Sequence, residues 1–483
     1  MNKGKQACKK LKKRSTSSGR PDREQREVNG ETLRTAVSWV VNEESFKQLR
    51  FHGNTNWVIG DLLILTVLWV WSDHTSLVAA FAEAHQWSLK MLGRAAVHSY
   101  QGLTGALGQV TATVLPVVCA RMRALMEQHG GEHWRVGGWL PLAVDGSRVS
   151  TPRTADNEQA FCAPNYGGSE TARYRRNKRK KNRTPRRRNK PQPVKPQIWL
   201  TLLWHMGLRL PWCWKTGPSN SSEREHFQEL VKTGQFPQKT LFCGDAGFVG
   251  YQLWKLIMDQ QQHFLIRVGS NVSLLRGLGY TRESHGMVTY WPTKEARKKQ
   301  PPLTLRLIQL RLGKTPIYLL TNVLDRQELS DATAQQLYQL RWGIELQFRT
   351  FKQTFGCGKL RSRTPDRALR ELDWSLVGLW MIQLFAVKEQ ILIGEPPERS
   401  SASQAIQVIR DMFHHWSEIP APNDNLFSKL SHAVTDQYQR SKTSKKGRYR
   451  PDNKDKPSAG KPLIIKAKRK HKLMLKQYLA LAI

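Results

Sequence analysis

The chain has 483 residues, which is enough for two to four domains and a large buried core. Lysine and arginine outnumber aspartate and glutamate by 77 to 38, giving a formal net charge of +39; this predicts a polyanionic partner, nucleic acid first and an anionic membrane second. The six scattered cysteines have no C-x-x-C spacing and the histidines no ligand spacing, which excludes an obvious zinc finger and a dense disulfide framework.

The N-terminal part of the chain divides into an arm and a helical region. Residues 1–34 are polar and basic and are expected to be a disordered arm. Residues 35–138 repeat apolar residues at helical spacing, which predicts a helical N-terminal domain. Its apolar run 58–71, and the later run 374–387, are shorter than the roughly 20 residues that span a bilayer. We therefore expect core helices, with no signal peptide and no membrane partner.

The central part of the chain, residues 139–396, alternates strand and helix patterns and predicts an α/β domain. Within it, 173–196 is so rich in arginine, lysine and proline that a mobile basic loop is expected, and 269–328 is expected to be a basic, β-rich insertion. Strands are predicted at 139–150, 197–206, 209–217, 239–248 and 263–268, and helices at 222–234, 251–262, 331–356 and 366–394. Without the insertion, this order fits a ribonuclease H-like mixed sheet that starts with an antiparallel hairpin. Residues 397–483 are expected to form a basic C-terminal region.

Three acidic residues, far apart in the chain, are the candidate catalytic and metal-binding groups. Asp145 and Asp245 are expected at the ends of apolar strands, and Glu345 on a long helix that can pack across those ends. Crowded carboxylates repel one another, and hard Mg²⁺ or Mn²⁺ ions relieve that repulsion. A pair of such ions supports in-line displacement at a phosphodiester. Either aspartate alone could instead mark a turn, since each is followed by glycine within two residues.

The predicted helix 331–356 carries Tyr338, Arg341, Glu345 and Lys352 within a sector of roughly 60° along about 21 Å, on ideal helix geometry. An apolar stripe lies beside them and is expected to be buried: Leu337, Leu340, Ile344, Phe348, Phe351 and Phe355. An acid framed by cations suits a metal-dependent site on a polyanion. A solvated helix face with weak ion pairs is the alternative for this segment alone.

Three sequence blocks carry a family resemblance that covers roughly residues 140–390. They are VDGSRVSTPRTADNEQAF around the first acid, LFCGDAGFVGYQLW around the second, and a Y-(2)-R-(3)-E-(6)-K signature with no spacing error. With them, the chain resembles the DDE transposases of insertion sequences of the IS4 type. Ser147 replaces the usual threonine after Asp-Gly, and the β-rich stretch before Glu345 falls where that family carries its insertion.

The resemblance implies roles, cofactors and partners. Asp145, Asp245 and Glu345 would hold two Mg²⁺ ions, for which Mn²⁺ can substitute, while Tyr338, Arg341 and Lys352 would contact phosphates. The reaction would be cleavage at the element's ends followed by strand transfer into target DNA, catalysed by a homodimer on paired ends. The double-stranded DNA partners would be the terminal inverted repeats and the target, in the cytoplasm at the nucleoid. Recognition of the ends is assigned to the helical N-terminal domain by analogy, because no clean helix-turn-helix is found there.

Two further DNA contacts are hypotheses. Trp291, in the insertion, is a candidate to stack on a flipped base, as a tryptophan does in some relatives; a buried core residue is the alternative. The basic loop could clamp DNA through phosphates, or could simply be a solvated or non-specific segment. Its candidate DNA-binding residues are Arg175, Arg176, Lys178 and Arg179.

Two rival functions remain open from the sequence. The first is a ribonuclease H-like nuclease that cuts DNA without joining it. The second is a non-catalytic DNA-binding derivative, although such a protein would have no need of the three intact acids.

Overall fold

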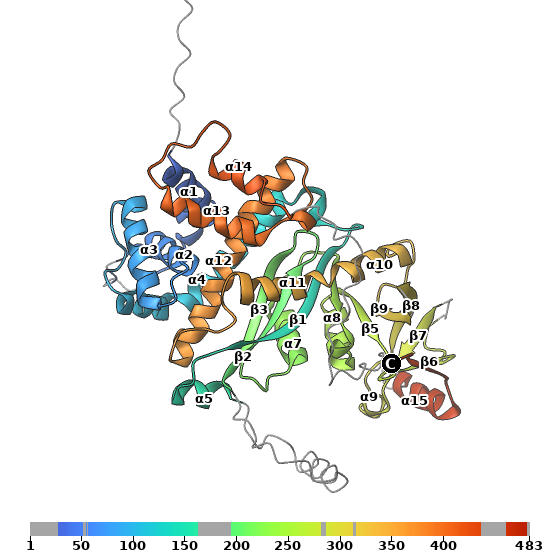
Figure 1. The fold of residues 1–483 in the computed structure, drawn as a ribbon. Helices are drawn as coiled ribbons and strands as arrows, with labels where there is room; N and C mark the ends of the chain where they lie inside the picture. The colour runs from blue at the N-terminus through green and yellow to red at the C-terminus, as the bar shows by residue number, and fades with distance from the viewer. Residues whose placement is uncertain are drawn as a thin grey trace, which may run out of the picture.

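The structure is a computed structural model that describes residues 28–51, 55, 57–162, 195–281, 286–312, 315–435 and 460–480. A long mixed sheet and a group of helices make up the molecule (Figure 1). The predicted α/β class is therefore confirmed. Most of the expected arm 1–34, and the basic loop apart from Lys195 and Pro196, lie outside the described residues.

In the part of the chain that the structure describes, the sheet has ten strands in the order β10-β6-β7-β8-β9-β5-β4-β1-β2-β3. Strands β1, β2 and β3 form an antiparallel meander, β4 and β5 run parallel to β1, and β9 returns antiparallel to β5. The strands are β1 Leu140–Ser150, β2 Gln197–His205, β3 Leu210–Gly217, β4 Thr240–Gly244, β5 His263–Val268, β6 Ser273–Arg276, β7 Met287–Tyr290, β8 Leu303–Leu312, β9 Thr315–Thr321 and β10 Leu463–Lys466.

The expected insertion 269–328 is not a separate sheet. Strand β9 pairs directly with β5, so β6 to β9 continue the central sheet beyond its parallel part. The C-terminal strand β10 then pairs in parallel with β6, about 190 residues away in the chain. The sheet therefore joins the centre of the molecule to the extreme C-terminal segment.

Helices cover both faces of the sheet. Helices α7 (Glu223–Thr233) and α8 (Tyr251–Asp259) pack on one face, and α11 (Gly343–Arg349) and α12 (Pro365–Leu392) pack on the other. The shorter elements around the sheet are α5 Ala155–Phe161, the 3-10 turn η3 Ala246–Phe248, α9 Thr293–Arg297, α10 Asp331–Leu340 and α15 Arg469–Leu479. Ser222 caps α7 by accepting a hydrogen bond from the backbone N–H of Glu225, as its sequence position predicts.

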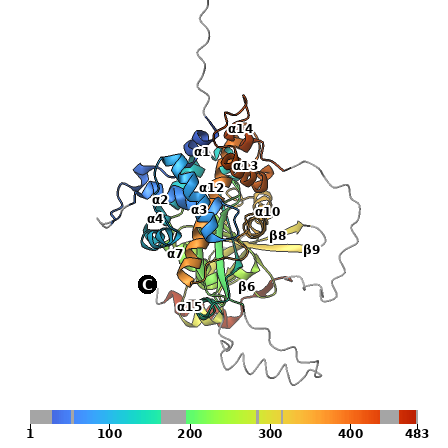
Figure 2. The same cartoon turned by 60° about the vertical axis from the view of Figure 1, so that its left-hand side comes forward.

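In the helical part of the molecule, the N-terminal helices and the helices that follow α12 in the chain pack together around α12 (Figures 1 and 2). Helix α12 packs against elements from before and after the sheet, including α2, α4, α13 and α14. The backbone N–H of Asn29 donates to Glu418 O at 3.1 Å, which ties the two ends of this part together. The helices are α1 Asn29–Ser38, α2 Ile59–Trp71, α3 Leu77–Leu92, α4 Tyr100–His129, α13 Ala402–His414 and α14 Leu426–Ser431, with 3-10 turns at Glu43–Phe46, Gly131–Trp134 and Pro397–Arg399.

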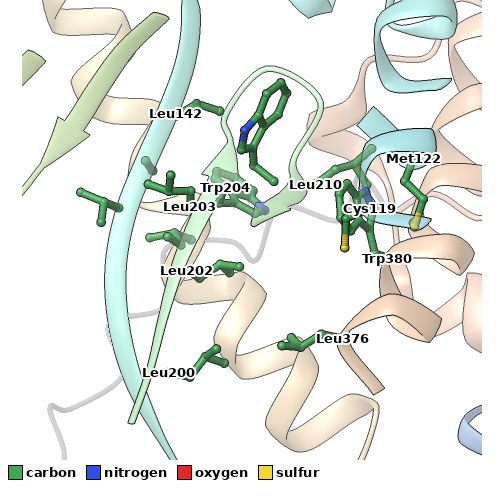
Figure 3. Packing of buried hydrophobic residues seen from close by; sticks show 14 of the residues in the cluster. Cys119, Met122, Leu142, Leu200, Leu202, Leu203, Trp204, Leu210, Leu376 and Trp380 are labelled. Carbon is green, nitrogen blue, oxygen red and sulfur yellow. The ribbon is translucent and has the colours of Figure 1, made fainter. Parts of the chain in front are cut away.

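Part of the core lies between β2 and the helices α4 and α12 (Figure 3). Alternate residues of β2, Leu200, Leu202 and Trp204, are fully buried on the side of the sheet that faces α12. Leu376 and Trp380 of α12 are equally buried. Because successive strand residues point to opposite faces, this pattern fixes which residues of the neighbouring β1 face α11 and α12.

Among the residues that the structure describes, two helices are long and apolar enough to cross a membrane by length and composition: α4 and α12. Their apolar windows are 50% and 78% buried inside the protein. In α12 this apolar character is explained by packing, since the helix contacts the sheet and several helices along its length.

Three predicted element boundaries are wrong. The predicted helix 331–356 is broken: α10 ends at Leu340, a turn follows, and after α11 the chain forms a π-helical turn over Thr350–Thr354. The strand predicted to 248 ends at Gly244, because the next residues form the 3-10 turn η3. Helix α8 is predicted to end at residue 262 but ends at Asp259. Gln261 cannot continue the helix because its backbone is in the left-handed conformation, with φ 54°.

Candidate active site

Asp145, on β1, lies close to Asp245, the residue that directly follows the neighbouring parallel strand β4. The prediction that Asp145 ends its strand is wrong, because β1 continues to Ser150. The pairing of β1 with β4, however, stops at Ala143 opposite Cys243. Asp145 and Asp245 each follow two residues after this last pair. Adjacent strands are about 4.8 Å apart, and residues at the same level of parallel strands share a face. The sheet thus presents both carboxylates together, on the side covered by α11.

Glu345 reaches the same place from α11, which packs against β1. Its side chain is 40% exposed, and its Oε1 lies 3.9 Å from Arg341 Nη2. Burial raises the pKa of Asp145 to about 6, the Gly146 N–H opposes this, and the charges of Asp245, Arg341 and Glu345 all act on Asp145. The three acids predicted from the sequence are therefore close enough to interact electrostatically.

Arg341 and Tyr338 form the wall next to these acids. The Arg341 side chain is only 10% exposed, and its guanidinium carbon lies 5.5 Å from the centre of the Tyr338 ring. Burial raises the pKa of Tyr338, which keeps the phenol neutral. Within the described residues, the buried Nε of Arg341 has no hydrogen-bond partner. A buried donor without a partner costs free energy unless a ligand supplies an acceptor, and a phosphate oxygen would do so.

Lys352 closes the site from the π-helical turn. Its Nζ donates to Ser147 Oγ at 2.5 Å, which links the turn to β1 two residues beyond Asp145. Burial lowers the pKa of Lys352. A π-helical turn has more residues per turn than an α-helix, so the direction predicted for Lys352 from ideal α-helix geometry does not apply. Its side chain nevertheless points toward β1, the strand that carries Asp145.

Glu223 was not predicted to belong to the site. It lies in the first turn of α7, on the face of the sheet opposite to the Asp145 side chain. Its carboxylate lies next to Gly146, the residue after Asp145. A Cβ at Gly146 would stand 2.7 Å from Glu223 Oε1, so any other residue here would displace this carboxylate from its present position. Burial, then Asp145 and Asp245, raise the pKa of Glu223 to about 7, while Arg148 opposes them. An acid in the first turn of a helix is so common that its position in the sequence carries no distinct signal.

The remaining predicted DNA contacts do not join this group. Trp291 is 6% exposed and its indole N–H donates to Gln300 O at 2.8 Å, so the structure places it in the core, the alternative that the sequence left open. By contrast, Trp342 is 59% exposed in the turn beside Arg341. The candidate loop residues Arg175, Arg176, Lys178 and Arg179 lie outside the described part of the chain.

The donor set fits a hard divalent cation. Three carboxylates on one side of the sheet supply only oxygen ligands, and the raised pKa of Asp145 reflects a site that favours neutralisation of its charge. Among the described residues, no three carboxylate, imidazole or thiol groups stand at the spacing of a ready-made metal site.

Metal binding is expected to tighten as the pH rises from 5 to 8, because Asp145 and Glu223, with pKa values of about 6 and 7, lose their protons in this interval. The effect should be roughly tenfold per pH unit for each proton displaced. The same raised pKa values mean that the metal-free fold is favoured by protonation below about pH 4, and that this contribution is lost as the pH rises through 6 to 7. Mn²⁺ titration calorimetry at several pH values measures the first effect.

The matched variants for this measurement are Glu223→Gln and Glu225→Gln, which remove one charge each from the same helix. Glu225 is exposed, so its variant should keep the full pH dependence. The variant Glu223→Gln should lose most of the change above pH 6. An unaltered pH dependence in that variant would separate Glu223 from the site.

Taken together, three carboxylates from β1, the end of β4 and α11 lie beside the buried Arg341 and the half-buried Lys352, an arrangement suited to a divalent metal ion and an anionic substrate. Comparison with known proteins specifies the class. The family described as "Transposase DDE domain" matches residues 140–381, half of the chain. The chain is 28% identical over 293 residues to "Transposase InsG for insertion sequence element IS4" from Escherichia coli (strain K12), covering 58% of this chain. It spans 59% of the length of that relative.

A solved structure, the piggyBac transposase synaptic complex with hairpin DNA, is similar at a TM-score of 0.37 and 13% sequence identity, over 88% of this chain and 90% of that one. The chain belongs to the transposase DDE domain family and is of the IS4 type, so the resemblance seen in the sequence is confirmed. Membership of this family implies dependence on a divalent metal ion.

Proposed function

We propose that this protein is the DNA transposase of an insertion sequence, which cleaves at the element's ends and transfers them into target DNA. The observation that carries the proposal is the position of Asp145 and Asp245, each two residues beyond the last paired residues of the parallel strands β1 and β4, with Glu345 on the helix that packs on β1. Family membership and the IS4-element relative support the same activity.

The proposed cofactor is a pair of Mg²⁺ ions held by Asp145, Asp245 and Glu345, with Mn²⁺ able to substitute. Such ions activate the attacking oxygen and stabilise the leaving oxygen of a phosphodiester. The carboxylates hold and orient the metal, and their mutual repulsion gives the site its affinity for cations. Glu223, behind Gly146, adds negative charge to the same region.

The cations of the site would position DNA rather than react with it. Within the described residues, Arg341 has a buried Nε without a partner, which could donate to a phosphate oxygen. The Tyr338 ring packs against the guanidinium and helps to hold it in place. Lys352 would hold a second phosphate from its place on Ser147. These contacts keep the scissile bond over the carboxylates, which is the positional part of catalysis.

The finer parts of the proposal concern fold and assembly. The order β3-β2-β1-β4-β5, with three antiparallel strands followed by two parallel ones, supports a ribonuclease H-like catalytic core within residues 139–396. The helical region before it would recognise the element's ends. We propose a homodimer on paired ends, because joining two ends calls for two sites, and a cytoplasmic location at the nucleoid, where the net charge of +39 favours DNA.

A strand-transfer assay tests the proposal. Purified protein with pre-cut element-end duplexes, a target plasmid and Mg²⁺ should produce joined products. Hydrolysis without joining would favour a nuclease on the same fold. DNA binding with neither reaction would favour a non-catalytic derivative.

A further inference from the structure

The C-terminal segment 460–480 folds back onto the far end of the sheet and forms a cleft there. Its strand β10 is held by β6, and the flanking N–H groups of Leu463 and Ala467 donate to Val272 O at 2.9 Å and Arg276 O at 2.8 Å. Helix α15 then lies beside α9, and Tyr478 packs edge-on against Tyr280 with ring centres 6.3 Å apart. Figure 1 shows α15 and α9 together at this end of the molecule.

A cavity of about 440 Å³ opens between α9 and α15. Its charged lining is entirely basic: Arg297 ends α9, Lys299 lies in the turn after it, and Lys470 and His471 belong to the first turn of α15. In the described part of the chain, Arg297, Lys299 and Lys470 form no ion pair within 4 Å. The fold thus brings unneutralised cations from segments 170 residues apart into one concave surface.

The start of α15 is an unfavourable place for these cations. Its first turn contains basic and no acidic residues, although the N-terminal end of a helix already carries partial positive charge. Burial and the charges of Lys470 and Lys468 lower the pKa of His471, as expected where positive charges repel one another. An anion in the cleft would relieve this repulsion and use the helix end as well.

We propose that this cleft, lined by Arg297, Lys299, Lys470 and His471, binds the sugar-phosphate backbone of double-stranded DNA without reading its sequence. The proposal rests on the proposed transposase function for the identity of the polyanion. The cleft and the acids belong to one sheet, in which β6 is five strand spacings from β4, roughly 24 Å.

A membrane surface is a poorer match for this feature. A helix that lies on a lipid surface buries its apolar face in the bilayer. Here Leu475 of α15 is only 5% exposed and Tyr478 packs against Tyr280 of the insertion, although Leu473 and Leu479 are 57% and 42% exposed. The cations face a concave cavity rather than a flat plane, which suits a rod-like phosphate backbone.

The test compares two double variants of the full chain with equal charge loss. The first, Lys299→Gln with Lys470→Gln, changes the cleft; the second, Lys298→Gln with Lys476→Gln, changes exposed lysines of the same two segments that do not line it. Binding of a 40-base-pair duplex of arbitrary sequence is measured against salt concentration. Circular dichroism confirms that both variants are folded.

The cleft variant should bind roughly tenfold more weakly at low salt, and its slope of log K against log[salt] should be shallower by about 1.8, or about 0.9 for each phosphate that the cleft no longer neutralises. The control should change the slope by much less. Equal effects in both variants would overturn the proposal, because they would reflect general charge rather than the cleft.

Two further arms separate the alternatives. Vesicles of phosphatidylserine and phosphatidylcholine replace the duplex; loss of vesicle binding in the cleft variant with unchanged DNA binding would also overturn the proposal. Because the duplex assay needs no cleavage or joining, it measures binding at the cleft even if strand transfer fails. Failure of the cleft and failure of the proposed function are therefore distinguishable.

Discussion

Replacing Asp145 by Asn, Asp245 by Asn, or Glu345 by Gln is expected to lower DNA cleavage by at least about 10³-fold while DNA binding stays within a few-fold of the original. Each change keeps the size of the side chain but removes one charged metal ligand. Metal ions supply several kcal/mol of transition-state stabilisation, and each 1.36 kcal/mol corresponds to a tenfold change in rate. Single-turnover cleavage of an element-end duplex, with a gel-shift assay for binding, measures both quantities.

The matched control is Asp156→Asn, because this aspartate is exposed in the first turn of α5 and lies in the same stretch of chain as Asp145. It should cleave DNA at nearly the original rate. If any one of the three site variants retains cleavage, that residue does not hold the metal. If cleavage and binding fall together, the loss is structural rather than catalytic.

Gly343→Ala is expected to lower cleavage by about 10²-fold, although Gly343 touches neither metal nor DNA in the proposed mechanism. A Cβ at this position would stand 2.2 Å from the ring of Trp204, which is 1% exposed and cannot move aside freely. Helix α11 must then shift away from β2 and carry Glu345, two residues on, with it. A displacement of about 1 Å at a catalytic group costs about 10² in rate.

The stability of this variant should also fall, by about 1–2 kcal/mol, since overpacking of a core costs about 1–3 kcal/mol and the helix propensity of alanine offsets up to about 1 kcal/mol. Gly105→Ala is the control: it lies in α4, and a Cβ there meets nothing within 4 Å. That variant should be unchanged or slightly more stable. Denaturant unfolding gives both values, and full activity in Gly343→Ala would show that α11 does not need this close approach.

Much of the sheet could be predicted because its signals are local. Apolar runs bounded by glycine, such as the one before Asp245, and a capped amphipathic helix after Ser222 lie close to where the sequence puts them. The pairing of β9 with β5, and of β10 with β6, could not be predicted in the same way. These contacts join residues tens to nearly two hundred positions apart, and nothing in either strand alone specifies its partner.

The site shows the same division. The spacing of Tyr338, Arg341, Glu345 and Lys352 indicated a shared surface, but not the break after Leu340 or the π-turn that holds Lys352. Those irregularities follow from tertiary packing, of which the close contact between Gly343 and Trp204 is one part. The role of Glu223 depends on how α7 packs beneath Gly146, a relation that no local pattern expresses.

The short strand β10 also bears on the solution behaviour of the chain. Sheet edges readily recruit strands from other molecules, and a brief edge bordered by lysines discourages this. Strand β10 has four residues, and exposed Lys461 and Lys466 flank and end it. A shortened product that stops before residue 460 would leave β6, another four-residue strand that ends in a basic residue, as the edge of the sheet. The C-terminal segment thus covers the outer border of the sheet with a second short, basic strand.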